Sequence, residues 1–265
     1  MTSAILTSPP SVLDALRGDR AARPPLDTAA AARRRAELEL GVAEVLGETT
    51  PDLPFVITAT ALGPGAGAVD LLASARGRLR GALVSVLLRL HVVGTAVTSP
   101  FDDALAAWCA EGPSPELLAR CEALDAEERA RLATDVTAHY VTLTRAIGEV
   151  PPGWNARTAQ RASLRLGGGR VLLRDTVDLV IGSTRTGVAS VVLLDVTTAP
   201  LGEGAERALR FHALVETLRS SAVPLRSAVL SSATGELWLR EVDDELLARA
   251  VLDVLAALHE QRRGR

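Results

Sequence analysis

Two aspartates stand inside apolar, β-branched stretches, where a charged side chain is least expected. Asp178 lies in the run Val177–Ile181, which has the composition of a buried strand. Asp195 lies in a second run of this kind, Val188–Thr197. An ionised carboxylate in a buried strand is costly unless it is paired with a cation or bound to a metal. The two aspartates are therefore the first candidates for a functional site.

The segment between the two runs, 182–187, is rich in Gly, Ser and Thr, which predicts a β-hairpin. A turn centred on Arg185 and Thr186 places Asp178 opposite Leu193. Diagonal neighbours on one face of such a ladder lie about 7–8 Å apart. We therefore expect Asp178 and Asp195 to share a face and to be able to hold one divalent cation. A slip of one residue would place them on opposite faces.

A purely structural explanation of the two aspartates stays open beside the metal site. Asp178 and Asp195 can also form ion pairs with arginines such as Arg161 or Arg174 inside a structural core.

An Asp near the end of one strand, followed by Asp-Val-Thr at 195–197, resembles the PD-(D/E)XK nuclease superfamily, and most closely its RecB-like branch. The resemblance extends over about residues 154–258 and implies a restriction-endonuclease-like mixed sheet flanked by helices. It implies a hydrolase that cleaves DNA, as an endonuclease or exonuclease, with Mg²⁺ as cofactor, for which Mn²⁺ can substitute. The implied metal ligands are Asp178, Asp195 and the carbonyl of Val196.

The sequence departs from this family at the residue that assists the attacking water. Thr197 stands where the family has a lysine, and the chain contains no lysine at all. The Gln and Tyr that the family often has in the next helix correspond here to Ala208 and His212. Arg207 or Arg210 of that helix is a candidate to supply the missing positive charge.

These departures indicate a degenerate active site. We expect Asp178, Asp195 and Thr197, with Arg207 or Arg210, to give weak Mg²⁺-dependent cleavage or none, and Thr197→Lys to raise it. The alternative is a non-catalytic protein of nuclease fold that binds a nucleic acid or a protein partner.

The composition sets limits on these functions. The chain has 265 residues and a net charge of −3, which does not suit a protein that coats nucleic acid non-specifically. Cys109 and Cys121 match no metal-binding spacing, which is typical of a reduced cytoplasmic protein. No segment has the length and apolar character of a membrane span, so no membrane contact is expected.

The chain changes character at Pro151-Pro152, with helical patterns before this point and strand patterns after it. The sequence therefore predicts an α+β fold, with a mixed sheet over residues 157–240 and the N-terminal helices packed around it. In chain order we expect a loose arm (1–26), a helical region (27–150), the nuclease-like core (151–261) and a disordered tail (262–265). Within the core we expect helices at 203–220 and 243–261.

Overall fold

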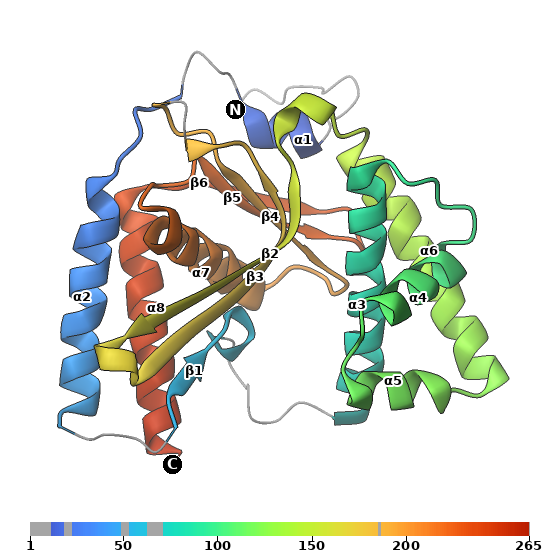
Figure 1. Ribbon diagram of the computed structural model, residues 1–265, viewed down its shortest axis with the longest axis horizontal. Helices are drawn as coiled ribbons and strands as arrows, with labels where there is room; N and C mark the ends of the chain where they lie inside the picture. Colours follow the sequence, from blue (N-terminus) through green and yellow to red (C-terminus); the bar gives the residue numbers. More distant parts are fainter. Residues whose placement is uncertain (1–11, 19–22, 49–52, 63–70, 185–186, 265) are drawn as a thin grey trace, which may run out of the picture.

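The computed structural model describes residues 12–18, 23–48, 53–62, 71–184 and 187–264. In this part of the chain, helices surround a six-stranded mixed sheet, so the predicted α+β class is confirmed (Figure 1). The helices are α1 (Val12–Arg17), α2 (Ala29–Leu46), α3 (Leu71–Val93), α4 (Pro100–Ala110), α5 (Pro115–Glu122), α6 (Ala126–Ile147), α7 (Glu203–Ser220) and α8 (Asp244–Arg263). The strands are β1 (Phe55–Ile57), β2 (Arg157–Leu166), β3 (Val171–Ile181), β4 (Val192–Thr197), β5 (Arg226–Ser231) and β6 (Leu237–Glu241). A 3₁₀ turn, η2 (Ala59–Leu62), follows β1.

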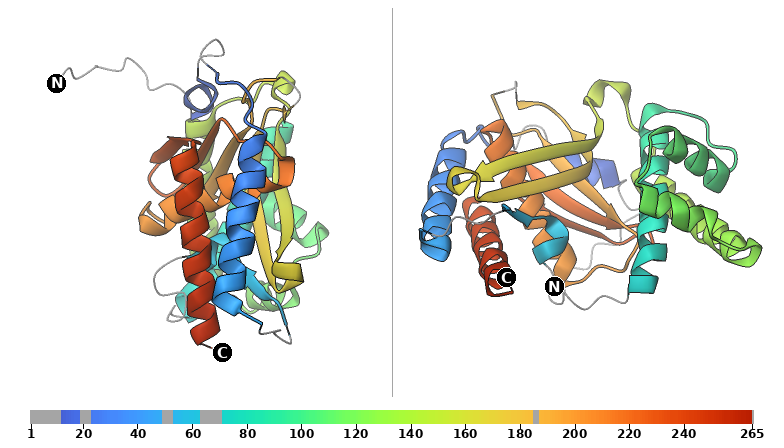
Figure 2. Two further views of the ribbon diagram at one scale, coloured as in Figure 1. Left: turned by 90° about the vertical axis from the view of Figure 1, so that its left-hand side faces the viewer. Right: turned by 60° about the horizontal axis from the view of Figure 1, so that its bottom comes forward.

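The helices form two groups at opposite ends of the sheet (Figures 1 and 2). Helices α2, α7 and α8 pack together and share an apolar core with the sheet, to which Leu38, Phe211 and Val254 contribute. Helices α3 to α6 pack on one another through Leu83, Trp108 and other apolar residues. Helices α3 and α6 meet the sheet through a separate apolar core, to which Leu88, Leu143 and Leu194 contribute.

Polar residues fix the helix starts where the sequence places them. The Asp125 carboxylate accepts a hydrogen bond from the N–H of Glu128, and the Glu128 carboxylate accepts one from the N–H of Asp125, which is a capping box. At α8 the Asp243 carboxylate caps the helix by accepting a hydrogen bond from the N–H of Leu246. At α2 the cap is Asp27, which accepts from two backbone N–H groups of the first turn.

Strand β3 is the organising strand of the sheet. Strand β2 pairs antiparallel with it from Val171 to Val180 and so occupies one edge of β3 along nearly its whole length. Strand β1 pairs with residues 171–173, and β4 pairs with residues 179–181. A strand has only two edges, so β1 and β4 must share the second one. Residues 174–178 therefore have no strand neighbour on that edge among the described residues, and the sheet opens there.

The hairpin register differs from the predicted one. Leu179 pairs with Leu194, which places Asp178 opposite Asp195 and not opposite Leu193. The connection is longer than predicted because Val188 bridges to Pro25 and the N–H of Ala189 donates to the carbonyl of Pro24. Strand β4 consequently begins at Val192. The shift equals two residues, so both aspartates keep the face that the alternation predicted.

Three expectations about the chain ends and the sheet were wrong. The N-terminal arm is not loose in its described part, because Val12, Leu13 and Leu16 of α1 are buried. The sheet is not confined to residues 157–240, since β1 joins it next to β3. The C-terminal tail is helical as far as Arg263, and the Arg262 guanidinium donates to the carbonyl of Val45 in α2. In each case apolar burial or a backbone acceptor compensates the cost of ordering the segment.

Among the described helices, none combines the length and apolar character needed to cross a bilayer.

Candidate functional site

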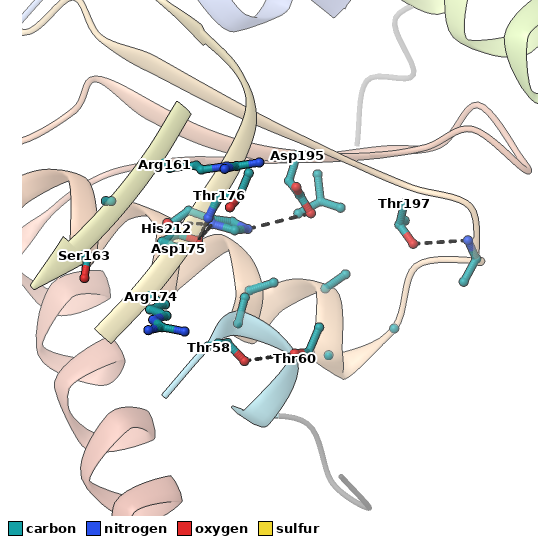
Figure 3. A pocket seen from close by; sticks show the side chains of 18 of the residues that line it. Thr58, Thr60, Arg161, Ser163, Arg174, Asp175, Thr176, Asp195, Thr197 and His212 are labelled. Atoms are coloured by element: carbon teal, nitrogen blue, oxygen red, sulfur yellow. Dashed lines mark hydrogen bonds and ion pairs between the residues drawn. The ribbon is translucent and has the colours of Figure 1, made fainter. Parts of the chain in front are cut away.

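A cavity of about 1000 Å³ lies where β3 parts from β4, and Figure 3 shows it from close by. Its walls come from β2, β3, the end of β4, η2 and the first turns of α7. The polar residues that line it are Thr58, Thr60, Arg161, Ser163, Arg174, Asp175, Thr176, Asp195, Thr197 and His212. Most of these side chains carry a hydroxyl or a positive charge, so the cavity suits a polar ligand.

The most buried polar contact of the cavity joins His212 of α7 to Asp175 of β3. The Nδ1 atom of His212 lies 2.8 Å and 3.0 Å from the two carboxylate oxygens of Asp175. Both side chains are almost fully buried, at 4% and 3% exposed. The other ring nitrogen, Nε2, lies 3.7 Å from Oδ2 of Asp195, which is too far for a hydrogen bond. Nε2 is thus a buried polar atom that has no hydrogen-bond partner among the described residues.

The charges around this imidazole favour its protonated form. Burial alone would lower the pKa of His212, but the charges of Asp175 and Asp195 and the bond to Asp175 raise the pKa well above its usual value. Burial raises the pKa of Asp195, and the positive charge of His212 more than offsets this, so the pKa lies below its usual value. His212 and its two carboxylates therefore form a network of opposite charges.

Asp178 stands in the next layer, between β4 and α3. Its Oδ1 accepts a hydrogen bond from the Ser85 hydroxyl at 2.9 Å, and its Oδ2 accepts one from the Val196 N–H at 2.9 Å. Burial and, after it, the negative charge of Asp195 raise the pKa of Asp178 to about 7. The two aspartates are thus directly opposite each other, whereas the sequence predicted diagonal neighbours, and Asp178 holds its proton far more firmly than an exposed carboxyl does.

The spacing of α7 decides which of its residues reach the cavity. Gly204, Ala205, Ala208 and His212 line it, since residues three and four apart lie on one face of a helix. Three of these are small, and they leave room next to the imidazole.

The predicted contribution of Arg207 and Arg210 was wrong, because neither residue lines the cavity. Arg207 donates to the carbonyl of Leu62 at 2.8 Å. Arg210 binds Asp253 of α8 at 2.8 Å. Both guanidinium groups lie on other faces of α7 and are already paired.

Thr197 lies in the cavity wall at the end of β4. Its hydroxyl oxygen accepts a hydrogen bond from the N–H of Ala199 at 3.1 Å, so it stabilises the turn that follows the strand. The backbone group of Val196 that meets Asp178 is its N–H, whereas the resemblance implied that its carbonyl would bind a metal.

The side chains as arranged do not fit a divalent cation. Within the described residues, no three His, Cys, Asp or Glu side chains come together as a metal-binding group. Both oxygens of Asp178 already accept hydrogen bonds, and Asp195 faces the imidazole of His212. A Mg²⁺ site at Asp178, Asp195 and Val196 stays a prediction that a titration has to decide.

The alternative in which arginines neutralise the two aspartates was wrong. In the described part of the chain, neither Arg161 nor Arg174 forms an ion pair with an acidic side chain, although both line the cavity. The partners of the aspartates are instead His212, Ser85 and a backbone N–H.

Asp175 was not singled out from the sequence. The feature that could have identified Asp175 is its position three residues before Asp178, in a strand that faces a helix with a buried histidine.

No family model and no curated protein matches this chain. Among solved structures, the chain is similar to one described as "Crystal structure of SSO0001", with 12% identity over 85% of this chain and 86% of the other. The TM-score is 0.30, a level that identifies neither a fold nor a function.

Proposed function

We propose that this chain is a PD-(D/E)XK-like protein that binds nucleic acid in the cavity between β3 and β4 and cleaves it weakly or not at all. The order of its core elements supports the resemblance. Strands β2, β3 and β4 form an antiparallel meander, and α7 then crosses over to β5, which pairs parallel with β4. Asp178 and Asp195 face each other across two strands of this unit.

The position of His212 is the observation that carries the non-catalytic part of the proposal. In a metal-dependent nuclease, a divalent cation balances the charge of the clustered carboxylates and polarises the phosphate. Here the imidazole of His212 lies between Asp175 and Asp195, and a protonated ring balances that charge from within the protein. Thr197 cannot supply positive charge or act as a base near neutral pH. The cavity thus retains a charged wall, but its described residues include neither a lysine nor a metal-binding group that would activate water.

The cavity lining favours nucleic acid over a protein partner. Arg161 and Arg174 carry positive charges that are not paired with acidic side chains of the described chain, and hydroxyl groups lie beside them. Arginine and hydroxyl side chains are typical contacts to phosphate oxygens. Binding of this kind needs no cofactor.

The decisive experiment measures binding and cleavage on the same labelled single-stranded and double-stranded DNA. We expect binding in EDTA that weakens as salt rises, and strands that stay intact on addition of Mg²⁺ or Mn²⁺. Asp195→Ala is the matched control for residual cleavage. Robust cleavage by the unmodified protein that Asp195→Ala abolishes would show an active nuclease, and the absence of any binding to DNA would refute the nucleic-acid part of the proposal.

A further inference from the structure

Two arginines and two hydroxyl residues form a compact group on one face of the β2–β3 ribbon. Arg161 pairs with Thr176, and Ser163 pairs with Arg174. Because side chains alternate along a strand, these four residues share one face, with the two arginines on a diagonal. Diagonal neighbours on one face lie about 7–8 Å apart, which is well within the reach of two arginine side chains. We call these four residues the arginine–hydroxyl square.

All four side chains of the square are exposed, and all four line the cavity. Figure 3 shows the guanidinium groups of Arg161 and Arg174 on either side of the Asp175–His212 pair. Neighbouring arginines often form ion pairs with acidic side chains. Within the described residues, neither Arg161 nor Arg174 does so. Their donors are available to a ligand.

The acidic residues of the cavity are engaged by other groups. Asp175 is bound to His212, and Asp195 faces the ring of that same residue. The Nε2 atom of His212 is buried and has no hydrogen-bond partner in the described chain, so an oxygen atom of a ligand that enters beside it would remove the cost of this unsatisfied group. The local balance of fixed charge around the square is therefore positive.

We propose that the arginine–hydroxyl square binds a phosphate group without a metal ion. Each guanidinium can donate two parallel hydrogen bonds to phosphate oxygens, and Ser163 and Thr176 can donate one each. This inference rests on the proposed function, since it names the part of a nucleic acid that the cavity recognises. The phosphate can belong to a strand end, to an internal diester or to the free anion, and these share the same chemistry.

The experiment compares three probes in EDTA by fluorescence anisotropy. A labelled oligonucleotide with a 5′-phosphate, the same strand with a 5′-hydroxyl, and inorganic phosphate as competitor separate the three sources. Arg161→Gln and Arg174→Gln test the square. Arg165→Gln is the matched control, because Arg165 lies on the same face of β2, two residues beyond Ser163, but does not line the cavity. Thermal melts of each variant show that it folds.

We expect each substitution in the square to weaken binding of the preferred probe about tenfold or more, and Arg165→Gln to change it by less than about twofold. Equal effects at all three arginines would overturn the site, since only general electrostatic attraction would remain. Preference for the 5′-phosphate strand assigns the strand end, equal binding of both strands assigns the diester, and competition by phosphate alone assigns the free anion.

The failure of this site and that of the proposed function give different results. If DNA binds but the square variants bind as the unmodified protein does, the phosphate site is wrong and the proposed function stands. If no DNA binds but calorimetry shows inorganic phosphate binding that Arg161→Gln and Arg174→Gln weaken, the site is correct and the proposed function is wrong.

Discussion

The imidazole of His212 donates from Nδ1 to the carboxylate of Asp175 at 2.8 Å and thereby ties helix α7 to strand β3 at the point where the sheet opens. The same ring faces Asp195 of β4 at 3.7 Å from Nε2. The His212 side chain therefore interacts electrostatically with both β3 and β4, the two strands that separate at the cavity. This arrangement determines both the stability and the chemistry of the site.

Removal of the imidazole is expected to destabilise the protein because it leaves the buried Asp175 carboxylate without a positive charge beside it and with only the Thr176 N–H as a donor. We predict that His212→Ala lowers the free energy of unfolding by about 3–5 kcal/mol. His212→Asn should cost clearly less, since the Asn amide can replace Nδ1 as the donor to Asp175. Urea denaturation measures both values, with His259→Ala, which alters an exposed histidine of α8, as the control. Equal effects of the Ala and Asn variants would contradict the proposed bond.

Asp178 should lower the stability of the protein as the pH rises, whereas an ion-paired carboxylate raises it. Its pKa is about 7 in the folded protein and near 3.8 when unperturbed, so the folded state binds more protons between these values. The contribution of Asp178 to stability therefore falls as pH rises through this window. Asp178→Asn removes the charge, and we expect it to stabilise the protein at about pH 8 by on the order of 2 kcal/mol and to have little effect near pH 4.

Thermal melts across this pH range measure that effect, with Asp102→Asn at an exposed position as the control. A variant whose stabilisation does not grow with pH would show that Asp178 is ionised in the folded protein.

Introduction of the missing lysine tests how far the site is from catalysis. The sequence alone predicts that Thr197→Lys raises Mg²⁺-dependent cleavage. The structure adds a condition, because His212 faces Asp195 and competes with a metal ion for that carboxylate. We therefore expect detectable cleavage only when Thr197→Lys is combined with His212→Tyr, and only while Asp178 and Asp195 are retained. Gel assays of the single and double variants decide this, and strong cleavage by Thr197→Lys alone would disprove the competition.

Gly182, the first residue after β3, is expected to tolerate no side chain. Its φ of +94° is one that L residues rarely adopt, and an added Cβ would lie 2.1 Å from the carbonyl oxygen of Ser190. We predict that Gly182→Ala destabilises the protein by about 3 kcal/mol or more. Gly187→Ala is the matched control, because Gly187 also has a positive φ but has open space around it. Similar losses at both positions would mean that backbone strain alone acts.

The sequence predicted the regular elements well because strong local signals agree with the tertiary packing. Helix α7 has the predicted bounds, and α8 begins within one residue of its predicted start, where Asp243 caps it. The register of the hairpin could not be predicted, since it depends on the pairing of residues 188–189 with a segment more than 160 positions away. The face of the two aspartates was correct because an even shift preserves alternation.

The site was only partly predictable for a related reason. Asp178, Asp195 and Thr197 stand out because polar residues in apolar strands are unusual. Asp175 and His212 carry no such signal by themselves, and their bond appears only when α7 packs on β3. The sequence did not indicate that Arg207 and Arg210 bind outside the cavity, because the groups that they bind, the Leu62 carbonyl and the Asp253 carboxylate, are remote in sequence.

The central claim is that the cavity binds nucleic acid without a metal ion because His212 occupies the place that the charge of a cation would take. The most direct test is the dissociation constant of a labelled single-stranded oligonucleotide, measured for the unmodified protein in EDTA and again in excess Mg²⁺. We expect closely similar affinities apart from the screening effect of added salt, which a matched monovalent series corrects. Binding that appears only with Mg²⁺ and is lost in Asp195→Ala would contradict it.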